Sequence, residues 1–121
     1  MILLIDISTR TARVGLIQDE KLVDSQEWES TSELGKKLVE VVDELLKKHD
    51  LELKDVTRVA VHRGKAGSSF MSLRTVIVTG TILAEAIGMD LVQLEGDSLE
   101  TMISEACQGE QVLTIDPNYL P

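Results

Sequence analysis

Two short segments carry residue types that could hold a phosphate group. Asp6 lies near the end of the apolar run MILLIDI at 1–7, and the hydroxyl-bearing Ser8 follows it in a polar turn. A carboxylate beside hydroxyl groups suits a metal-bound phosphate. In the second segment, RGKAGSS at 63–69, Gly67 and Ser69 directly precede an expected helix, whose free N–H groups attract anions. Asp6, Ser8, Gly67 and Ser69 are therefore candidates for a degenerate nucleotide-binding site.

Both segments also have ordinary structural explanations. The loop at 63–69 lacks the GxxxxGK[ST] order of a P-loop, and a Gly/Ser loop before a helix is commonly a turn with an N-cap. A nucleotide site at Asp6 would need a second lobe that closes over it, and 121 residues leave no room for one. Asp6 is then favoured as a structural, hydrogen-bonded carboxylate.

The remaining reactive residue types form no catalytic constellation. His49 and His62 are far apart, and Cys107 has no neighbouring cation that would activate it. One cysteine excludes an internal disulfide and a thiolate metal cluster. We therefore expect no catalytic residue, no metal site and no cofactor, and we predict that the chain is not an enzyme.

The elements that must position these residues begin with three strands and continue with helices and strands in alternation. Apolar runs bounded by polar turns predict an antiparallel meander, and the capping box Ser30–Glu33 begins an amphipathic helix. The expected strands are 1–7, 12–17, 22–28, 56–61 and 91–94, with a last short strand at 112–115, and the expected helices are 32–49, 70–87 and 98–107. This order predicts an α/β fold: a mixed sheet with an N-terminal antiparallel meander and flanking helices.

The helix at 70–87 is the most informative element, because only Arg74 and Glu85 carry charge. A helix that is apolar on all sides is covered on all sides. Ser72, Val76, Gly80 and Ala84 form a small-residue stripe along which another helix could approach closely. We therefore expect a protein interface; the alternative is that the helix at 34–46 covers this one inside the chain. The expected interface residues are Leu34, Leu38, Val41, Phe70, Leu73, Val76, Ile77, Gly80 and Ala84.

Charge excludes some partners. The net charge is −9, and no Lys or Arg occurs from Thr75 to Pro121. Such a surface repels phosphate backbones, so we expect no direct binding of nucleic acid. Neither a signal peptide nor a membrane-spanning run is present in the sequence, which predicts a cytoplasmic protein without a membrane partner.

Three segments resemble the TsaB (YeaZ) family. They are ILLIDISTRTARVGL at 2–16, RGKAGSSFMSLRTVIVTGTILAEAIG at 63–88 and LVQLEGDSLETM at 91–102. The matching positions are Asp6, Ser8, Gly67, Ser69, Phe70, Leu73, Arg74, Ser98 and Leu99. The loop at 63–69 is longer than the family's GPGSFTGLR-type loop and lacks its proline, which weakens the case for a nucleotide.

The resemblance implies the fold of the actin/Hsp70/sugar-kinase superfamily, a ribonuclease-H-like (actin-like ATPase) single lobe. We expect 1–121 to be one TsaB-like N-terminal lobe; the tail PNYLP is similar to the PxYLR-like end of full-length members and favours a natural one-lobe version.

The implied function is that of a non-catalytic scaffold or activator in the biosynthesis of the tRNA modification threonylcarbamoyladenosine (t6A). The implied partner is a TsaD-like catalytic subunit, bound through helices 32–49 and 70–87, with a homodimer when the chain is alone. On this hypothesis Gly80→Leu blocks assembly without unfolding the monomer. The alternatives are a minimal nucleotide-binding actin-like lobe and a homodimeric interaction module with another partner.

Overall fold

The computed structural model describes residues 1–7, 11–29, 34–64, 70–112 and 115. Its first three strands form the predicted antiparallel meander: β1 (Ile2–Asp6), β2 (Thr11–Gln18) and β3 (Lys21–Glu29). Asp19 and Glu20 connect β2 to β3 with φ angles of 54° and 62°. Positive φ at both central residues gives a turn whose twist matches that of the flanking strands.

Two parallel strands complete the sheet. β4 (Arg58–His62) pairs with β1, and β5 (Asp90–Leu94) pairs with β4, so the strand order is β3-β2-β1-β4-β5. The predicted mixed sheet is confirmed. A strand was expected at 112–115, but the described residues Val112 and Ile115 are not in a strand; Val112 donates its N–H to the Leu91 carbonyl at 2.8 Å, and Ile115 is buried in the larger core cluster.

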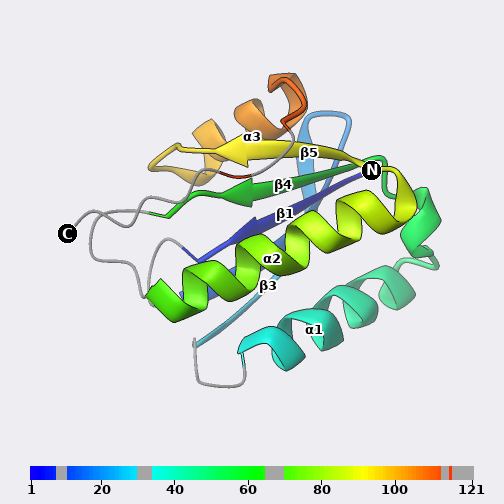
Figure 1. Cartoon of the computed structure of the whole chain (residues 1–121). Coiled ribbons are helices and arrows are strands. Elements are labelled where there is room, and N and C mark those ends of the chain that lie inside the picture. Colours follow the sequence, from blue (N-terminus) through cyan, green and yellow to red (C-terminus); the bar gives the residue numbers. More distant parts are fainter. Residues whose placement is uncertain (8–10, 30–33, 65–69, 113–114, 116–121) are drawn as a thin grey trace.

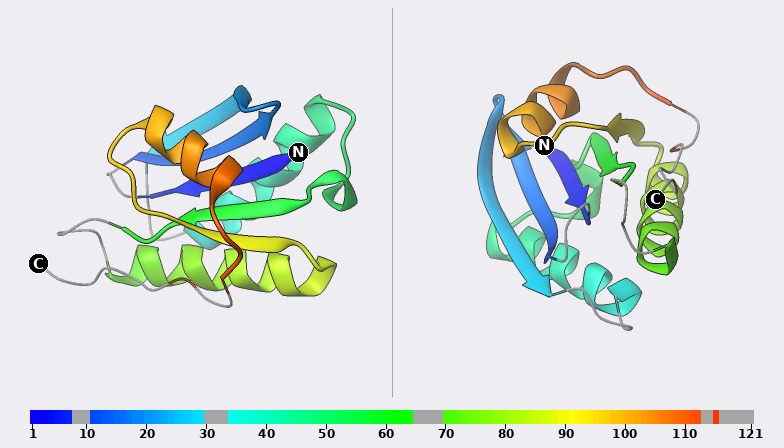
Figure 2. Two further views of the ribbon diagram at one scale, coloured as in Figure 1. Left: turned by 90° about the horizontal axis from the view of Figure 1, so that it is seen from above. Right: turned by 90° about the vertical axis from the view of Figure 1, so that its left-hand side faces the viewer.

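Helices cover both faces of this sheet. α1 (Leu34–Lys48) and α2 (Phe70–Ile87) lie beside each other on one face, and α3 (Leu99–Gln108) lies on the other (Figures 1 and 2). A short 3₁₀ turn, η1 (Leu53–Asp55), follows α1. The larger core cluster joins α1 and α2 to the sheet, and a smaller cluster joins Met102 and Ala106 of α3 to it.

The ends of α2 and α3 follow from local sequence. Gly88 has a φ of 73°, and the next residue, Met89, donates its N–H to the Ala84 carbonyl at 2.9 Å. This is the left-handed C′ glycine that the sequence predicts. Ser98 is the N-cap of α3, with its hydroxyl accepting from the Thr101 N–H at 3.2 Å. The predicted cap of α1 at 30–33 lies outside the described residues.

Candidate functional site

The two helices α1 and α2 form the candidate site, and each has a buried and a water-facing side. From α1, the side chains of Leu38, Val41, Val42, Leu45 and Leu46 enter the larger core cluster. Ile77 and Ala84 of α2 enter the same cluster. The outer side of α1 is mainly charged, whereas the described exposed residues of α2 are two apolar and two charged ones, Val78, Ile82, Arg74 and Glu85.

Within the small-residue stripe of α2, the described residues Gly80 and Ala84 face the sheet and not a partner. Gly80 is buried, and a Cβ placed on it would lie only 2.6 Å from Cγ2 of Val61 on β4. Ile77 and Ala84 are 8% and 4% exposed. The close approach that the small residues permit is therefore between α2 and its own sheet, and these three interface assignments are corrected.

On α1, Leu38 and Val41 are both 0% exposed, so they too are core residues and add no exposed surface of their own to an interface. The remaining expected interface residues are Leu34, Phe70, Leu73 and Val76; their side chains lie outside the described part of the structure.

Three other aliphatic side chains are exposed on this helical layer. Val78 and Ile82 of α2 are 48% and 58% exposed, and Val39 of α1 is 57% exposed. A signal for the α2 pair is present in the sequence. Arg74 and Glu85 are the only charged residues of the helix, they mark its water-facing side, and Val78 and Ile82 lie between them on that same side.

A groove of about 560 Å³ lies between the two helices. It is lined by Leu38, Val39, Val42, Asp43, Leu46, Lys47, Leu51, Glu52, Leu53 and Thr79. At its rim, Asp43 and Lys47 form an ion pair of 2.9 Å, and the hydrogen bond from the ammonium to Asp43 raises the pKa of Lys47. The groove is thus an apolar depression with a charged rim on the same face as the exposed aliphatic residues.

Of the four candidate nucleotide-binding residues, only Asp6 lies within the described part of the structure. Asp6 is 4% exposed at the carboxyl end of β1, where α/β sheets commonly bind ligands. Ser8, Gly67 and Ser69 lie outside the described residues. Nearby, the His62 ring accepts the Gly64 N–H at Nδ1 (2.9 Å), so its Nε2 carries the proton that it donates to the Gly96 carbonyl at 2.9 Å. Both ring nitrogens of His62 are therefore used by the backbone.

The other reactive side chains have structural roles. His49 Nε2 lies 2.9 Å from Asp24 Oδ2 and ties the end of α1 to β3. Burial, together with the charge of Glu20, raises the pKa of Cys107 and keeps it a thiol. Across the described residues, no group of three His, Cys, Asp or Glu side chains is placed to hold a metal ion. No helix formed by those residues has the length and apolar character needed to cross a membrane.

Comparison with known proteins identifies solved structures with a similar fold. No family model and no curated protein matches the sequence. Among solved structures, YeaZ from Pseudomonas aeruginosa is similar, with a TM-score of 0.69 and 23% identity over 78% of this chain. A second structure, described as an uncharacterized protein with similarity to peptidase YEAZ from Pseudomonas aeruginosa, has the same TM-score, identity and coverage of this chain.

The chain spans less than half of those proteins, 43% and 42% of their respective lengths. The likeness therefore concerns the arrangement of this lobe: a five-stranded mixed sheet with helices on both faces, as the resemblance to TsaB implied. The chain has a YeaZ-like (TsaB-like) fold.

Proposed function

We propose that the chain is a non-catalytic scaffold subunit that docks onto a TsaD-like catalytic subunit in t6A biosynthesis, through the helical face of α1 and α2. The observation that carries the proposal is the exposure of Val39, Val78 and Ile82 on one layer. The YeaZ-like fold supports the choice of partner. Val78 and Ile82 lie one helical turn apart, a spacing that suits contact with a second helix.

The groove between α1 and α2 suits a helix from the partner. A helix that lies along it would cover the apolar lining from Val39 to Thr79 and bury Val78 and Ile82 as well. Burying a fully exposed aliphatic side chain contributes roughly 1.5–3 kcal/mol, and Val39, Val78 and Ile82 are each about half exposed, so each contributes roughly half of that. Because the buried sides of both helices are already used by the sheet, docking requires no rearrangement of the core.

Light scattering of the chain mixed with a TsaD-like subunit tests this proposal. We expect the wild type to give the mass of a complex, and the double variant Val78→Glu/Ile82→Glu to give two separate species. Val23→Glu is a matched control, since Val23 is 46% exposed but lies on β3, belongs to neither helix and does not line the groove. A complex that survives the double variant, or that is also lost in the control, would contradict docking through this face.

The same face can pair with a second copy when the partner is absent. Arg74, Val78, Ile82 and Glu85 are exposed along one stripe of α2, and Arg74 and Glu85 form no ion pair with the described residues. In an antiparallel pair of α2 helices centred level with Gly80, Val78 of one copy opposes Ile82 of the other. Arg74 then faces Glu85 at each end, so the stripe is self-complementary.

A charge swap tests the homodimer separately from the complex. Arg74→Glu and Glu85→Arg should each shift the mass of the isolated chain toward the monomer, since like charges then oppose each other. The double swap should restore the dimer. A wild type that is monomeric at high concentration, or single variants that remain dimeric, would contradict this pairing while leaving the proposal for the TsaD-like partner intact.

A minimal nucleotide-binding lobe is the second candidate, and the buried Asp6 at the carboxyl edge favours it. Isothermal titration with ATP and Mg²⁺ tests it. Heat that is present in the wild type and absent in Asp6→Asn would support a nucleotide site, provided that the variant has the same circular dichroism spectrum. No heat from the wild type would remove this candidate.

A further inference from the structure

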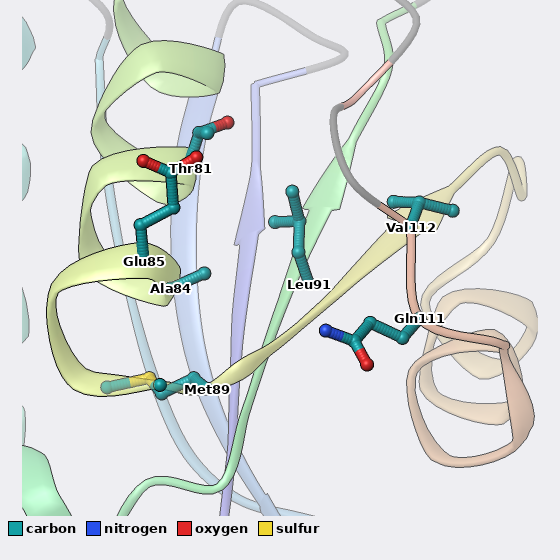
Figure 3. A pocket seen from close by; sticks show the side chains of 8 residues that line it. Thr81, Ala84, Glu85, Met89, Leu91, Gln111 and Val112 are labelled. Carbon is teal, nitrogen blue, oxygen red and sulfur yellow. The ribbon is translucent and has the colours of Figure 1, made fainter.

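A second hollow lies on the flank of α2 that points away from α1. Its volume is about 230 Å³, and it is bounded by α2, the start of β5 and the segment that follows α3. Figure 3 shows Thr81, Ala84 and Glu85 along α2 on one side, Gln111 and Val112 on the other, and Leu91 between them. Thr79, which lines the groove toward α1, is absent from this hollow, so the two depressions are separate.

The walls of the hollow combine an apolar floor with a polar rim. Ala84, Met89 and Leu91 are 3–5% exposed and form the floor. Glu85 and Gln111 are exposed at the rim, together with the half-buried Thr81. A ligand that fits must therefore have an apolar part and a polar end.

The rim presents hydrogen-bond acceptors. The Thr81 hydroxyl donates its proton to the Ile77 carbonyl at 2.8 Å, so only its lone pairs are left for a ligand. The ionised Glu85 carboxylate can only accept, whereas the Gln111 amide can accept through its oxygen or donate through its nitrogen. A ligand group that binds Thr81 and Glu85 must therefore be a hydrogen-bond donor.

The negative charge around the hollow favours a positively charged hydrogen-bond donor as the ligand. From Thr75 to Pro121 the chain has eight acidic residues and no Lys or Arg. The nearby Arg58 is engaged with carbonyls at the end of α3 and with Asp90. Glu85 makes no ion pair within the described part of the chain. An anion would be repelled here, whereas a cation gains from a carboxylate beside an apolar floor.

The volume of the hollow limits the size of the ligand. At about 30 Å³ for each water of the liquid, the hollow holds about seven or eight waters, which leaves enough room for one arginine or lysine side chain. We propose that this hollow binds a guanidinium or ammonium group on a short aliphatic stem, with the stem on the floor and the cation at Glu85. The source is either an arginine or lysine side chain of another protein or a free amine such as agmatine.

NMR titration of the full chain with agmatine tests the site through the backbone amides of Thr81, Glu85, Leu91 and Val112. We expect saturable shifts at millimolar ligand, weakened by added salt. Glu85→Gln should weaken binding about fivefold, the factor that corresponds to ~1 kcal/mol. Glu44→Gln on α1 is the control, because it changes the net charge equally at an exposed position outside the hollow.

Butylurea, a neutral molecule of similar shape, separates charge recognition from simple filling and should not bind. The blocked amino acid N-acetylarginine methylamide distinguishes the sources: tighter binding than agmatine points to a protein side chain, and weaker binding points to a free amine. The proposal is overturned by the absence of shifts with both cations, by equal binding of butylurea, or by equal losses in Glu85→Gln and Glu44→Gln. None of these results bears on docking of the TsaD-like subunit through Val78 and Ile82, and light scattering of Glu85→Gln shows separately whether the homodimer changes.

Discussion

The two faces of the sheet hold their helices by different means. On one face, α1 and α2 are held mainly by aliphatic side chains that enter the larger core cluster. On the other, α3 contributes two fully buried apolar residues, Met102 and Ala106, and is fixed by hydrogen bonds at both ends. The attachment of α1 and α2 therefore depends on the volume and shape of apolar side chains. The attachment of α3 depends more on hydrogen-bond partners for individual polar atoms.

The polar anchors of α3 join segments distant in sequence. One nitrogen of Arg58, Nη1, donates to the carbonyls of Ala106, Cys107 and Gly109 at 3.0–3.2 Å, which satisfies the carboxyl end of the helix. Along the helix, the Glu105 carboxylate accepts the backbone N–H groups of Glu95 and Gly96 at 2.7–3.2 Å. The α3 face is therefore more sensitive to the loss of one polar group than to a small change in volume.

The largest effect should come from adding volume on the α1–α2 face. Gly80→Leu is expected to unfold the chain or to cost more than about 3 kcal/mol, because even a Cβ at this position would lie 2.6 Å from Val61. This outcome replaces the sequence-based expectation that the variant would spare the monomer. Urea unfolding measures it, with Val78→Leu on the exposed side as the control. Equal stability of the two variants would show that α2 does not pack as described.

Removing the arginine anchor should have the next largest effect, on the α3 face. Arg58→Met leaves up to three carbonyls without their donor and should cost about 1–3 kcal/mol of unfolding free energy. Arg63→Met is the control, since Arg63 forms an ion pair of 3.0 Å with the exposed Glu95 and should cost less than about 1 kcal/mol. Equal losses in the two variants would mean that the anchor adds nothing beyond an ordinary surface contact.

Removing the N-cap of α3 should reduce the free energy of unfolding by less than removing Arg58. Ser98→Ala removes the acceptor of the Thr101 N–H and should cost about 1 kcal/mol. Ser104→Ala, at an exposed position within the same helix, should be neutral or slightly stabilising because alanine favours the helix. Thermal unfolding of both variants checks the difference. A loss that is equal in both would contradict the assignment of Ser98 as the cap.

The smallest effect is expected from Asp24, whose side chain fixes the end of α1 to β3 on the face that is otherwise held by apolar contacts. Hydrogen bonds from His49 and Lys48 lower the pKa of Asp24 from 3.8 to about 2. A lowered folded-state pKa stabilises the protein above pH 3.8, and this contribution disappears as the pH falls through about 2. Asp24→Asn should therefore flatten the pH dependence of stability over that range. Acid titrations of the wild type and the variant measure the two slopes, and equal slopes would contradict this role of Asp24.

Local patterns predicted most of the fold. The meander, the bounds of α2 and the terminating Gly88 follow from neighbouring residues and are confirmed. The orientation of α2 could not be predicted from its apolar residues, because they surround the helix and define no buried side. The bonds from Arg58 and Glu105 were also missed, since each joins residues that only the folded sheet brings together.

The position of β1 in the sheet has a consequence for synthesis of the chain. β1 leaves the ribosome before β2 and can pair with it soon afterwards, but its other edge pairs with β4, with Ile2 opposite Arg58. Until β4 emerges, the apolar residues from Leu3 to Ile5 lie beside an open edge that can pair with another chain. The period between the synthesis of the meander and that of β4 is therefore when the nascent protein is most prone to aggregate.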